Sequence, residues 1–279
     1  MVSREQARAE FERMVKRPEP LFDLARAALV IAAESDPQVD VDAEIKRIDG
    51  WANELKSRLD PTWNNLQKLA RLRRFLFEEL GFAGDGKDYF SPSNSLLHEV
   101  IQRRRGIPLT LAILLMELGW RIGMPLEGVG FPGHFLVRLA GEPEDLLLDP
   151  FQHAMSVHEE DCRRMLAEIT RGEVEFSPRL IESVDKRQMI VRLLHNLKSS
   201  YVRQGADAEA LAAVERLLIL EPNDLTQVRD RGLLMFRLQR YAPAFESLRR
   251  YLAEATDAPD REDIERTVAA IKEQLRTLN

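Results

Sequence analysis

The chain has 279 residues, of which 44% are hydrophobic and 31% charged, and its formal net charge is −6. This length allows two domains with full-sized cores, and the composition is that of a globular protein rather than a disordered one. The negative charge gives no electrostatic reason to expect a nucleic-acid partner, and a single cysteine excludes an intrachain disulfide. The charged first residues and the lack of an apolar run of about 18–20 residues predict a cytoplasmic protein with no membrane span.

The first 80 residues have the periodicity of helices. Apolar residues recur at the spacing of one buried helix face at Leu21, Leu24, Ala25, Ala28 and Leu29. A second helix is expected over 41–59 and a third over 64–80, ended by Gly81. The basic runs at 71–74 and 103–105 fall in helical patterns, so we expect solvated or ion-paired arginines there rather than phosphate ligands.

The next segment is predicted to hold a loop and two further helices. The glycines and acidic residues of 84–88 do not have the spacing of a calcium-binding EF-hand loop. Asn94 or Ser95 is expected to cap a short helix that ends near Arg105. A strongly apolar helix over 109–122 follows, and Gly123 closes it.

After this helix the pattern changes from helical to extended. Short runs rich in valine, leucine and phenylalanine, separated by glycine and proline, occupy 126–131, 134–140 and 146–149. In the second run, alternation places His134, Leu136 and Arg138 on one face. Helices followed by a small antiparallel sheet make an α+β domain, which we expect to span residues 1–178.

Residues 179–279 are expected to form an all-helical domain with an internal repeat. Similar residues occur 34 positions apart in the pairs Tyr201 and Met235, Ala210 and Ala244, Val214 and Leu248, Leu217 and Tyr251. This is the tetratricopeptide period, and Pro222 and Gly232 stand at suitable positions of the two repeats. With a final helix over 261–278 the repeats would make a short solenoid; a generic helical bundle with chance spacing is the alternative.

Three segments of the chain carry a resemblance to a known family. They are Asn94-Ser95-Leu96-Leu97 … Arg104-Arg105-Gly106-Ile107-Pro108, then Gly128-Val129-Gly130-Phe131-Pro132-Gly133-His134-Phe135, then Asp149-Pro150-Phe151. Together with the domain order, they resemble the bacterial SirB-type family, whose members join a transglutaminase-like core to C-terminal tetratricopeptide repeats. The resemblance implies a transglutaminase-like, papain-like fold, with His134 and Asp149 at the family's catalytic histidine and aspartate positions.

The same resemblance places the family's nucleophilic cysteine at or next to Pro108, where this chain has none. Cysteine–histidine–aspartate chemistry needs a thiolate beside the histidine, and neither Pro108, Leu109 nor Leu111 can supply one. Thr110 is the nearest hydroxyl, but it is a poor nucleophile without a well-placed base. Cys162 follows both partners in a charged helical segment, and we expect a structural or exposed thiol there.

A hairpin register would bring the remaining pair together. If the turn between the second and third runs is Gly141–Glu144, Leu136 faces Asp149 and His134 lies one diagonal step away on the same face. A turn of odd length would instead put His134 and Asp149 on opposite faces of the sheet.

The sequence therefore supports two functional hypotheses. The first is a non-catalytic interaction or regulatory protein, a pseudoenzyme that keeps His134 and Asp149 as a structural pair or as part of a binding cleft, and whose helical repeats bind a protein or peptide partner. The alternative is an amide-bond hydrolase or acyltransferase that uses His134 and Asp149 with a non-cysteine nucleophile. The five histidines show no metal-ligand spacing and no glycine-rich phosphate loop is present, so neither a metal nor a cofactor is expected. No nucleic-acid or membrane partner is expected, and the oligomeric state is open.

Overall fold

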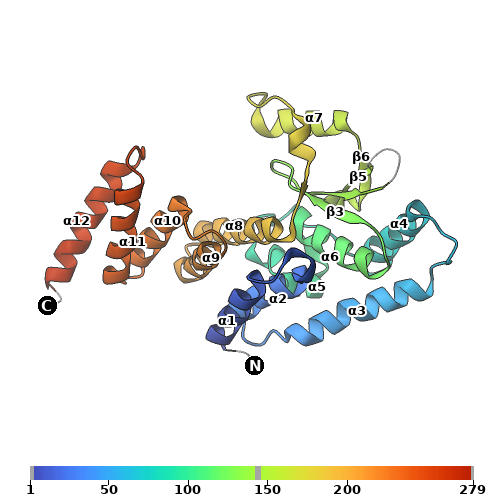
Figure 1. The fold of residues 1–279 in the computed structure, drawn as a ribbon, viewed down its shortest axis with the longest axis horizontal. Helices are drawn as coiled ribbons and strands as arrows, with labels where there is room; N and C mark the ends of the chain where they lie inside the picture. The colour runs from blue at the N-terminus through green and yellow to red at the C-terminus, as the bar shows by residue number, and fades with distance from the viewer. Residues whose placement is uncertain (1–2, 142–145, 278–279) are drawn as a thin grey trace. The chain divides into compact units, whose positions relative to one another are not determined.

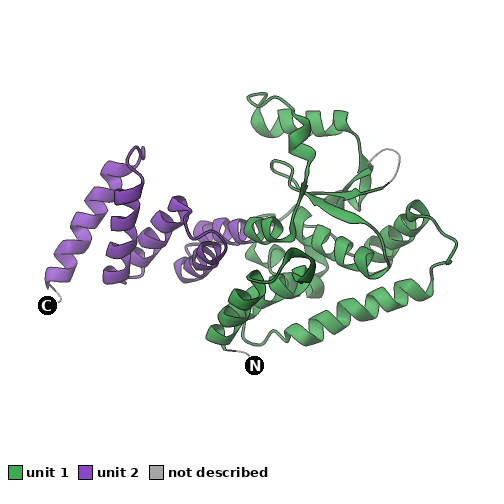
Figure 2. Cartoon of the chain, in the orientation of Figure 1, with its two compact units in different colours: residues 1–193 green, residues 194–279 purple. Residues whose placement is uncertain are grey.

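A computed structural model describes residues 3–141 and 146–277 of the chain. The chain divides into two compact units, residues 1–193 and 194–279 (Figure 2). This division falls inside helix α8, Lys186–Gln204, rather than at 178/179. The predicted domain boundary at 178/179 therefore remains a prediction.

Side-chain caps start the N-terminal helices of the first unit. The Ser3 hydroxyl accepts the N–H of Gln6, and the Asp40 carboxylate accepts the N–H of Ala43, which satisfies donors that a helix start leaves free. The helices of this region are α1, Arg4–Val15; α2, Leu24–Ser35; α3, Val41–Ser57; α4, Asn65–Arg73; α5, Leu97–Arg103; and α6, Pro108–Arg121 (Figure 1). Nearly every residue of α2 is buried, so this helix lies in the core of the unit.

Some helix boundaries differ from the prediction because local caps decide them. Leu21 is 66% exposed in a short 3-10 turn, η1 (Glu19–Leu21), because Asp23 caps α2. Asn94 and Ser95 do not cap α5, whose N-cap is Leu96. The Asn94 amide instead donates to the Asp88 carbonyl, which fixes the preceding loop.

The extended region forms an antiparallel sheet. The predicted strands are present as β3, Leu126–Val129; β4, Leu136–Leu139; and β5, Leu146–Asp149. Two short strands that the sequence did not predict extend it, β6 (Met155–Val157) and β7 (Ser183–Val184), and give the order β6-β5-β4-β3-β7. The predicted α+β class of the N-terminal part is confirmed.

Helices cover both faces of this sheet. Helix α6 packs against β3 and β4, and in Figure 1 the sheet lies between α6 and helix α7, Glu159–Thr170. Cys162 and Leu166 of α7 share a buried cluster with Leu136 and Leu147. A short parallel pair, β1 (Ala83–Gly84) and β2 (Arg105–Gly106), lies beside the 3-10 turn that follows β5, η4 (Pro150–Gln152).

The second unit is an array of helices. After the end of α8 they are α9, Asp207–Leu220; α10, Leu225–Arg237; α11, Tyr241–Glu254; and α12, Arg261–Thr277. The four residue pairs spaced by 34 positions are all buried, as the repeat predicts. Gly232 of α10 lies so close to α11 that a Cβ there would approach Leu248 Cδ2 to 2.5 Å, which explains the small residue. The predicted all-helical C-terminal part is confirmed.

Candidate functional site

The hairpin register between β4 and β5 agrees with the prediction. Val137 pairs with Leu148 and Leu139 with Leu146, and the same register continued by one residue places Leu136 opposite Asp149. Residues 142–144 of the predicted turn lie outside the described residues. His134 and Asp149 lie on the same side of the sheet as a result, with Nε2 of the imidazole 2.8 Å from Oδ1 of the carboxylate.

This His–Asp contact is a close polar contact rather than an aligned hydrogen bond. The Nε2 atom is buried and forms no hydrogen bond of good geometry within the described residues, although Oδ1 lies 2.8 Å away. The imidazole keeps 18% of its side-chain surface exposed, and the carboxylate keeps 8%. The pair therefore lies at the edge of the core, with the imidazole the more accessible partner.

Asp149 also holds the backbone that follows it. Its Oδ1 atom accepts the N–H of Phe151 at 2.8 Å and that of Gln152 at 3.3 Å, so the carboxylate is the N-cap of η4. The aspartate would be needed at this position whether or not the histidine does any chemistry.

Aromatic and cationic side chains complete the surroundings of His134. Phe151 lies edge-on to the imidazole with ring centroids 6.3 Å apart, and Tyr89 lies edge-on to Phe151 at 6.1 Å. The Arg192 guanidinium donates to the carbonyls of Phe131 and His134, and burial lowers its pKa from the ordinary value. Burial also raises the pKa of the Tyr89 hydroxyl.

Sequence reasoning missed Tyr89 and Arg192. Both come from segments far from the motif, and only the folded chain brings them to it. Phe151 was already part of the motif, in the segment Asp149-Pro150-Phe151, but the sequence assigned it no role.

The predicted nucleophile position is occupied by structural groups. Pro108 and Leu109 are buried at the start of α6, where the proline's missing N–H costs nothing. The Thr110 hydroxyl is fully buried; it accepts the N–H of Ile107 at 3.1 Å and donates to the Asn94 carbonyl at 2.8 Å. Within the part of the chain that the structure describes, no hydrogen bond joins Thr110 to His134.

Cys162 is a core residue and not a free surface thiol. Its side chain is fully buried under β4 and β5. Burial, assisted by the nearby carboxylates of Asp161 and Glu159, raises the pKa of the thiol to about 11. A thiol with that pKa is almost entirely protonated at neutral pH, so it is a weak nucleophile.

Metal sites and membrane spans concern residues 3–141 and 146–277, the part of the chain that the structure describes. In these ranges, no three histidine, cysteine, aspartate or glutamate side chains gather in a way that could hold a metal ion. Nor does any helix in these ranges combine the length and hydropathy that crossing a bilayer demands. The basic runs form ion pairs as predicted, for example Arg71 with Glu79 and Arg103 with Asp85.

Comparisons with known proteins agree with both units. Residues 42–195 match the transglutaminase-like superfamily, and residues 197–276 match the tetratricopeptide repeat. The UPF0162 protein of Xylella fastidiosa (strain 9a5c) is 34% identical over 232 residues, which cover 82% of this chain and 83% of that protein. The UPF0162 protein of Vibrio cholerae is 32% identical over 199 residues, 71% of this chain and 73% of its own length. A mouse protein, F-box only protein 21, is 31% identical over 147 residues, half of this chain but 23% of that protein.

Proposed function

This chain belongs to the UPF0162 family within the transglutaminase-like superfamily, and on that premise we propose that it is a non-catalytic interaction protein. Its N-terminal unit would be a pseudoenzyme, retaining the His134 and Asp149 positions while the nucleophile is gone. Its tetratricopeptide unit would bind a protein or peptide partner and so give the chain a regulatory role. We propose a cytoplasmic location, in keeping with the single cysteine.

The observation that carries this proposal is the state of the Thr110 hydroxyl. A catalytic nucleophile must be accessible to substrate and lie within hydrogen-bond reach of its base. The Thr110 hydroxyl is fully buried, and both its donor and its acceptor capacity serve the backbone. Cys162 is buried too, with a raised pKa. Neither residue has the properties of an activated nucleophile.

The double role of Asp149 supports the same conclusion. A carboxylate that caps η4 and lies against a buried imidazole nitrogen contributes to the fold whether or not it takes part in catalysis. The retention of both residues is therefore explained without turnover.

A small hollow of the second unit is where a partner would bind. It has a volume of about 130 Å³ and lies on α8 and α10, lined by Lys198, Val202, Asp230, Leu233, Leu234 and Arg237. Val202 keeps 43% of its surface exposed there, and Lys198 is held at 2.8 Å by both Gln227 and Asp230. An exposed apolar residue beside fixed charges is the kind of surface that anchors one side chain of a peptide.

One observation favours the rival function, an amide-bond hydrolase or acyltransferase. The partly exposed imidazole lies 2.8 Å from a carboxylate, close enough for that carboxylate to orient a general base after a small rotation of the ring. With Nε2 beside Asp149, the other ring nitrogen would have to accept the proton of a nucleophile from outside the described contacts, such as a substrate hydroxyl or a water molecule.

Capture from a bacterial lysate combined with a turnover assay tests the two functions. Immobilised full-length protein is compared with Val202→Glu, with the matched control Val174→Glu at another exposed valine, and with His134→Ala. An interaction function predicts captured proteins that Val202→Glu loses and both other variants keep. The rival function predicts hydroxamate formation from a glutaminyl dipeptide and hydroxylamine that His134→Ala abolishes. Turnover of that kind would contradict the interaction proposal.

A further inference from the structure

Arg192, in the first half of α8, is a positive charge that the fold leaves without a carboxylate partner. Its Nη2 atom donates to the carbonyls of Phe131, at 2.9 Å, and His134, and its Cζ atom lies 5.4 Å from the centre of the Phe135 ring. No aspartate or glutamate of residues 3–141 and 146–277 forms an ion pair or a hydrogen bond with it. A charge removed from water normally has a counter-ion, because its desolvation is otherwise costly. The guanidinium therefore suits an anion that the chain itself does not provide.

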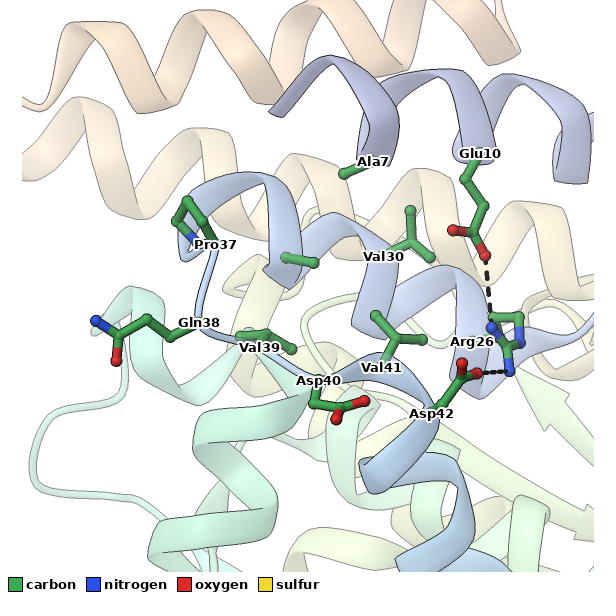
Figure 3. Close-up of a pocket in the computed structure, with 11 residues that line it drawn as sticks. Ala7, Glu10, Arg26, Val30, Pro37, Gln38, Val39, Asp40, Val41 and Asp42 are labelled. Atoms are coloured by element: carbon green, nitrogen blue, oxygen red, sulfur yellow. Dashed lines mark hydrogen bonds and ion pairs between the residues drawn. The ribbon is translucent and has the colours of Figure 1, made fainter. Parts of the chain in front are cut away.

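Arg26 shows the arrangement that Arg192 lacks. It borders a hollow of about 330 Å³ between α1, α2 and the segment that leads into α3, and its guanidinium pairs with Glu10 at 3.5 Å and with Asp42 at 2.5 Å (Figure 3). The hydrogen bond to Asp42 raises the pKa of Arg26, whereas burial lowers the pKa of Arg192. The charge of Arg26 is therefore balanced from within the chain, and that of Arg192 is not.

Polar atoms at and near this charge are open to a ligand. The Nε and Nη1 atoms of Arg192 and the hydroxyl oxygen of Tyr89 form no hydrogen bond within the described residues, and none of these atoms is buried. Arg192 and Tyr89 influence each other's pKa, so they lie near one another, and burial raises the pKa of the Tyr89 hydroxyl, which stays protonated and able to donate at neutral pH. Gly130 leaves space at Nη1, since a Cβ built there would lie 3.7 Å from that atom. Both side chains therefore have donors left for an anion.

An aromatic and apolar surface adjoins the guanidinium. Tyr89 lies edge-on to Phe151 with ring centroids 6.1 Å apart, and Phe151 lies edge-on to His134 at 6.3 Å. At the residue before His134, a Cβ built on Gly133 would come within 2.8 Å of Ile169 Cδ1, so this isoleucine lies directly over the glycine. Ile169 keeps 50% of its surface exposed. A ligand that reaches the guanidinium can therefore also cover exposed apolar surface.

We propose that Arg192 and Tyr89 bind the carboxylate of an aspartate or glutamate side chain in a partner protein, and that an apolar residue next to it packs on Ile169 and Phe151. One guanidinium and one neutral phenol supply a single positive charge, which suits a carboxylate. A doubly charged phosphate would be repelled more strongly by the Asp149 carboxylate, which lies beside the same imidazole. The exposed apolar surface favours a protein segment over a free small acid, because a segment brings both groups, and arginine and tyrosine are enriched in protein interfaces. The site lies in the first unit and does not need the hollow on α8 and α10, so it goes beyond the function proposed above.

Titrations followed by NMR spectroscopy of the full-length protein at pH 7.5 and low salt test the site. The probe is acetyl-Leu-Glu-amide, and the comparison ligands are the uncharged acetyl-Leu-Gln-amide, acetyl-Gly-Glu-amide and inorganic phosphate. Saturable shifts are expected for the Nε–H signal of Arg192 and the backbone amides of Gly133 and His134, with a dissociation constant of about 1–10 mM for so small a ligand. The glutamine peptide should bind about tenfold more weakly because it lacks the charge. The glycine peptide should bind about threefold more weakly because it lacks the apolar contact.

Matched variants separate the two donors from general attraction to arginines. Arg192→Gln removes the charge and should weaken the binding of acetyl-Leu-Glu-amide about tenfold. Tyr89→Phe keeps the aromatic ring and removes only the hydroxyl, and should weaken binding about threefold. Arg276→Gln removes an exposed arginine that pairs with Glu273, and should change nothing. Thermal unfolding checks that each variant is folded. If Arg192→Gln is not folded, Tyr89→Phe and the comparison of the glutamate and glutamine peptides on the unsubstituted protein decide.

Several results would each overturn the proposal. They are the absence of saturable shifts at Arg192 and Gly133, equal binding of the glutamate and glutamine peptides, tighter binding of inorganic phosphate than of acetyl-Leu-Glu-amide, and unchanged affinity in Tyr89→Phe. Capture from a lysate through the hollow on α8 and α10 concerns a different surface, so either experiment can fail without the other.

Discussion

One oxygen of Asp149 serves three partners: it lies 2.8 Å from Nε2 of His134, accepts the N–H of Phe151 at the same distance and accepts that of Gln152 at 3.3 Å. The pair and the cap can therefore be separated by substitution. Asp149→Asn keeps an oxygen for the cap but removes the charge that faces the imidazole, whereas Asp149→Ala removes both.

We expect Asp149→Ala to destabilise the protein by more than Asp149→Asn, by about 1 kcal/mol for the lost cap. His134→Ala should also lower the melting temperature, because it leaves the Asp149 carboxylate, at the edge of the core, without the imidazole beside it. Thermal unfolding followed by circular dichroism measures all three variants. If His134→Ala has an unchanged or higher melting temperature, the structural role fails, since catalytic residues are often neutral or stabilising when removed.

Thr110→Val should destabilise the protein by about 1–3 kcal/mol, because the buried N–H of Ile107 loses its acceptor. Thr110→Ser keeps a hydroxyl at the same place and serves as the control. Chemical denaturation of the two variants compares them directly. Equal stability of valine and serine at this position would show that the hydroxyl does not hold the start of α6.

The Cys162 thiol should resist alkylation by iodoacetamide in the native protein at pH 8, because it is buried and its pKa is raised to about 11. About 6 M guanidinium chloride unfolds most small domains, and the Cys162 thiol should then react at the rate of a free cysteine. Mass spectrometry of the alkylated protein follows both reactions. Rapid native labelling would restore Cys162 as a candidate nucleophile.

Gly232→Ala and Gly50→Ala should have opposite effects on stability. At Gly232 a new Cβ would lie 2.5 Å from the buried Leu248 side chain, and overpacking costs about 1–3 kcal/mol. At Gly50, exposed within α3, nothing lies within 4 Å of the new Cβ, so the helix gains about 0.5–1 kcal/mol. Unfolding curves of the two variants check the signs. Stabilisation by Gly232→Ala would show that α10 and α11 are less tightly packed than described.

His98 should make the N-terminal unit sensitive to mild acid. Burial lowers its pKa below the ordinary value of 6.5, so the unfolded chain takes up a proton more readily than the folded one. Stability is therefore fully present above pH 6.5 and is lost as the pH falls below it, by at most about 1.4 kcal/mol per pH unit for one group. Urea unfolding at pH 7.5, 6.5 and 5.5 should show a shallower loss for His98→Gln. An unchanged slope would exclude this histidine, and His195→Gln provides a comparison in the second unit, where burial lowers another histidine's pKa.

The sequence predicted those features that a period or a local motif encodes. Alternation gave β3, β4 and β5, the register of one hairpin brought His134 next to Asp149, and the 34-residue spacing identified the buried positions of the helical repeat. Each of these depends on neighbours along the chain or on a regular interval, so no knowledge of distant contacts was needed.

Other features depend on contacts that no local pattern encodes. Strand β7 has two residues and exists because the chain returns to pair with β3 after more than fifty residues. Asn94 does not cap α5, whose N-cap is Leu96, because the Oδ1 atom that a cap would use accepts a hydrogen bond from Arg103 instead.

Arg192 bears on the order in which segments of the protein fold during translation. Its guanidinium holds the carbonyls of Phe131 and His134, and β7, at 183–184, closes the edge of the sheet beside β3. A nascent chain that has emerged from the ribosome only as far as residue 178 lacks both features. We therefore expect the segment around His134 to mature late in translation, and a protease pulse during synthesis should cleave it until residues 183–192 have been released.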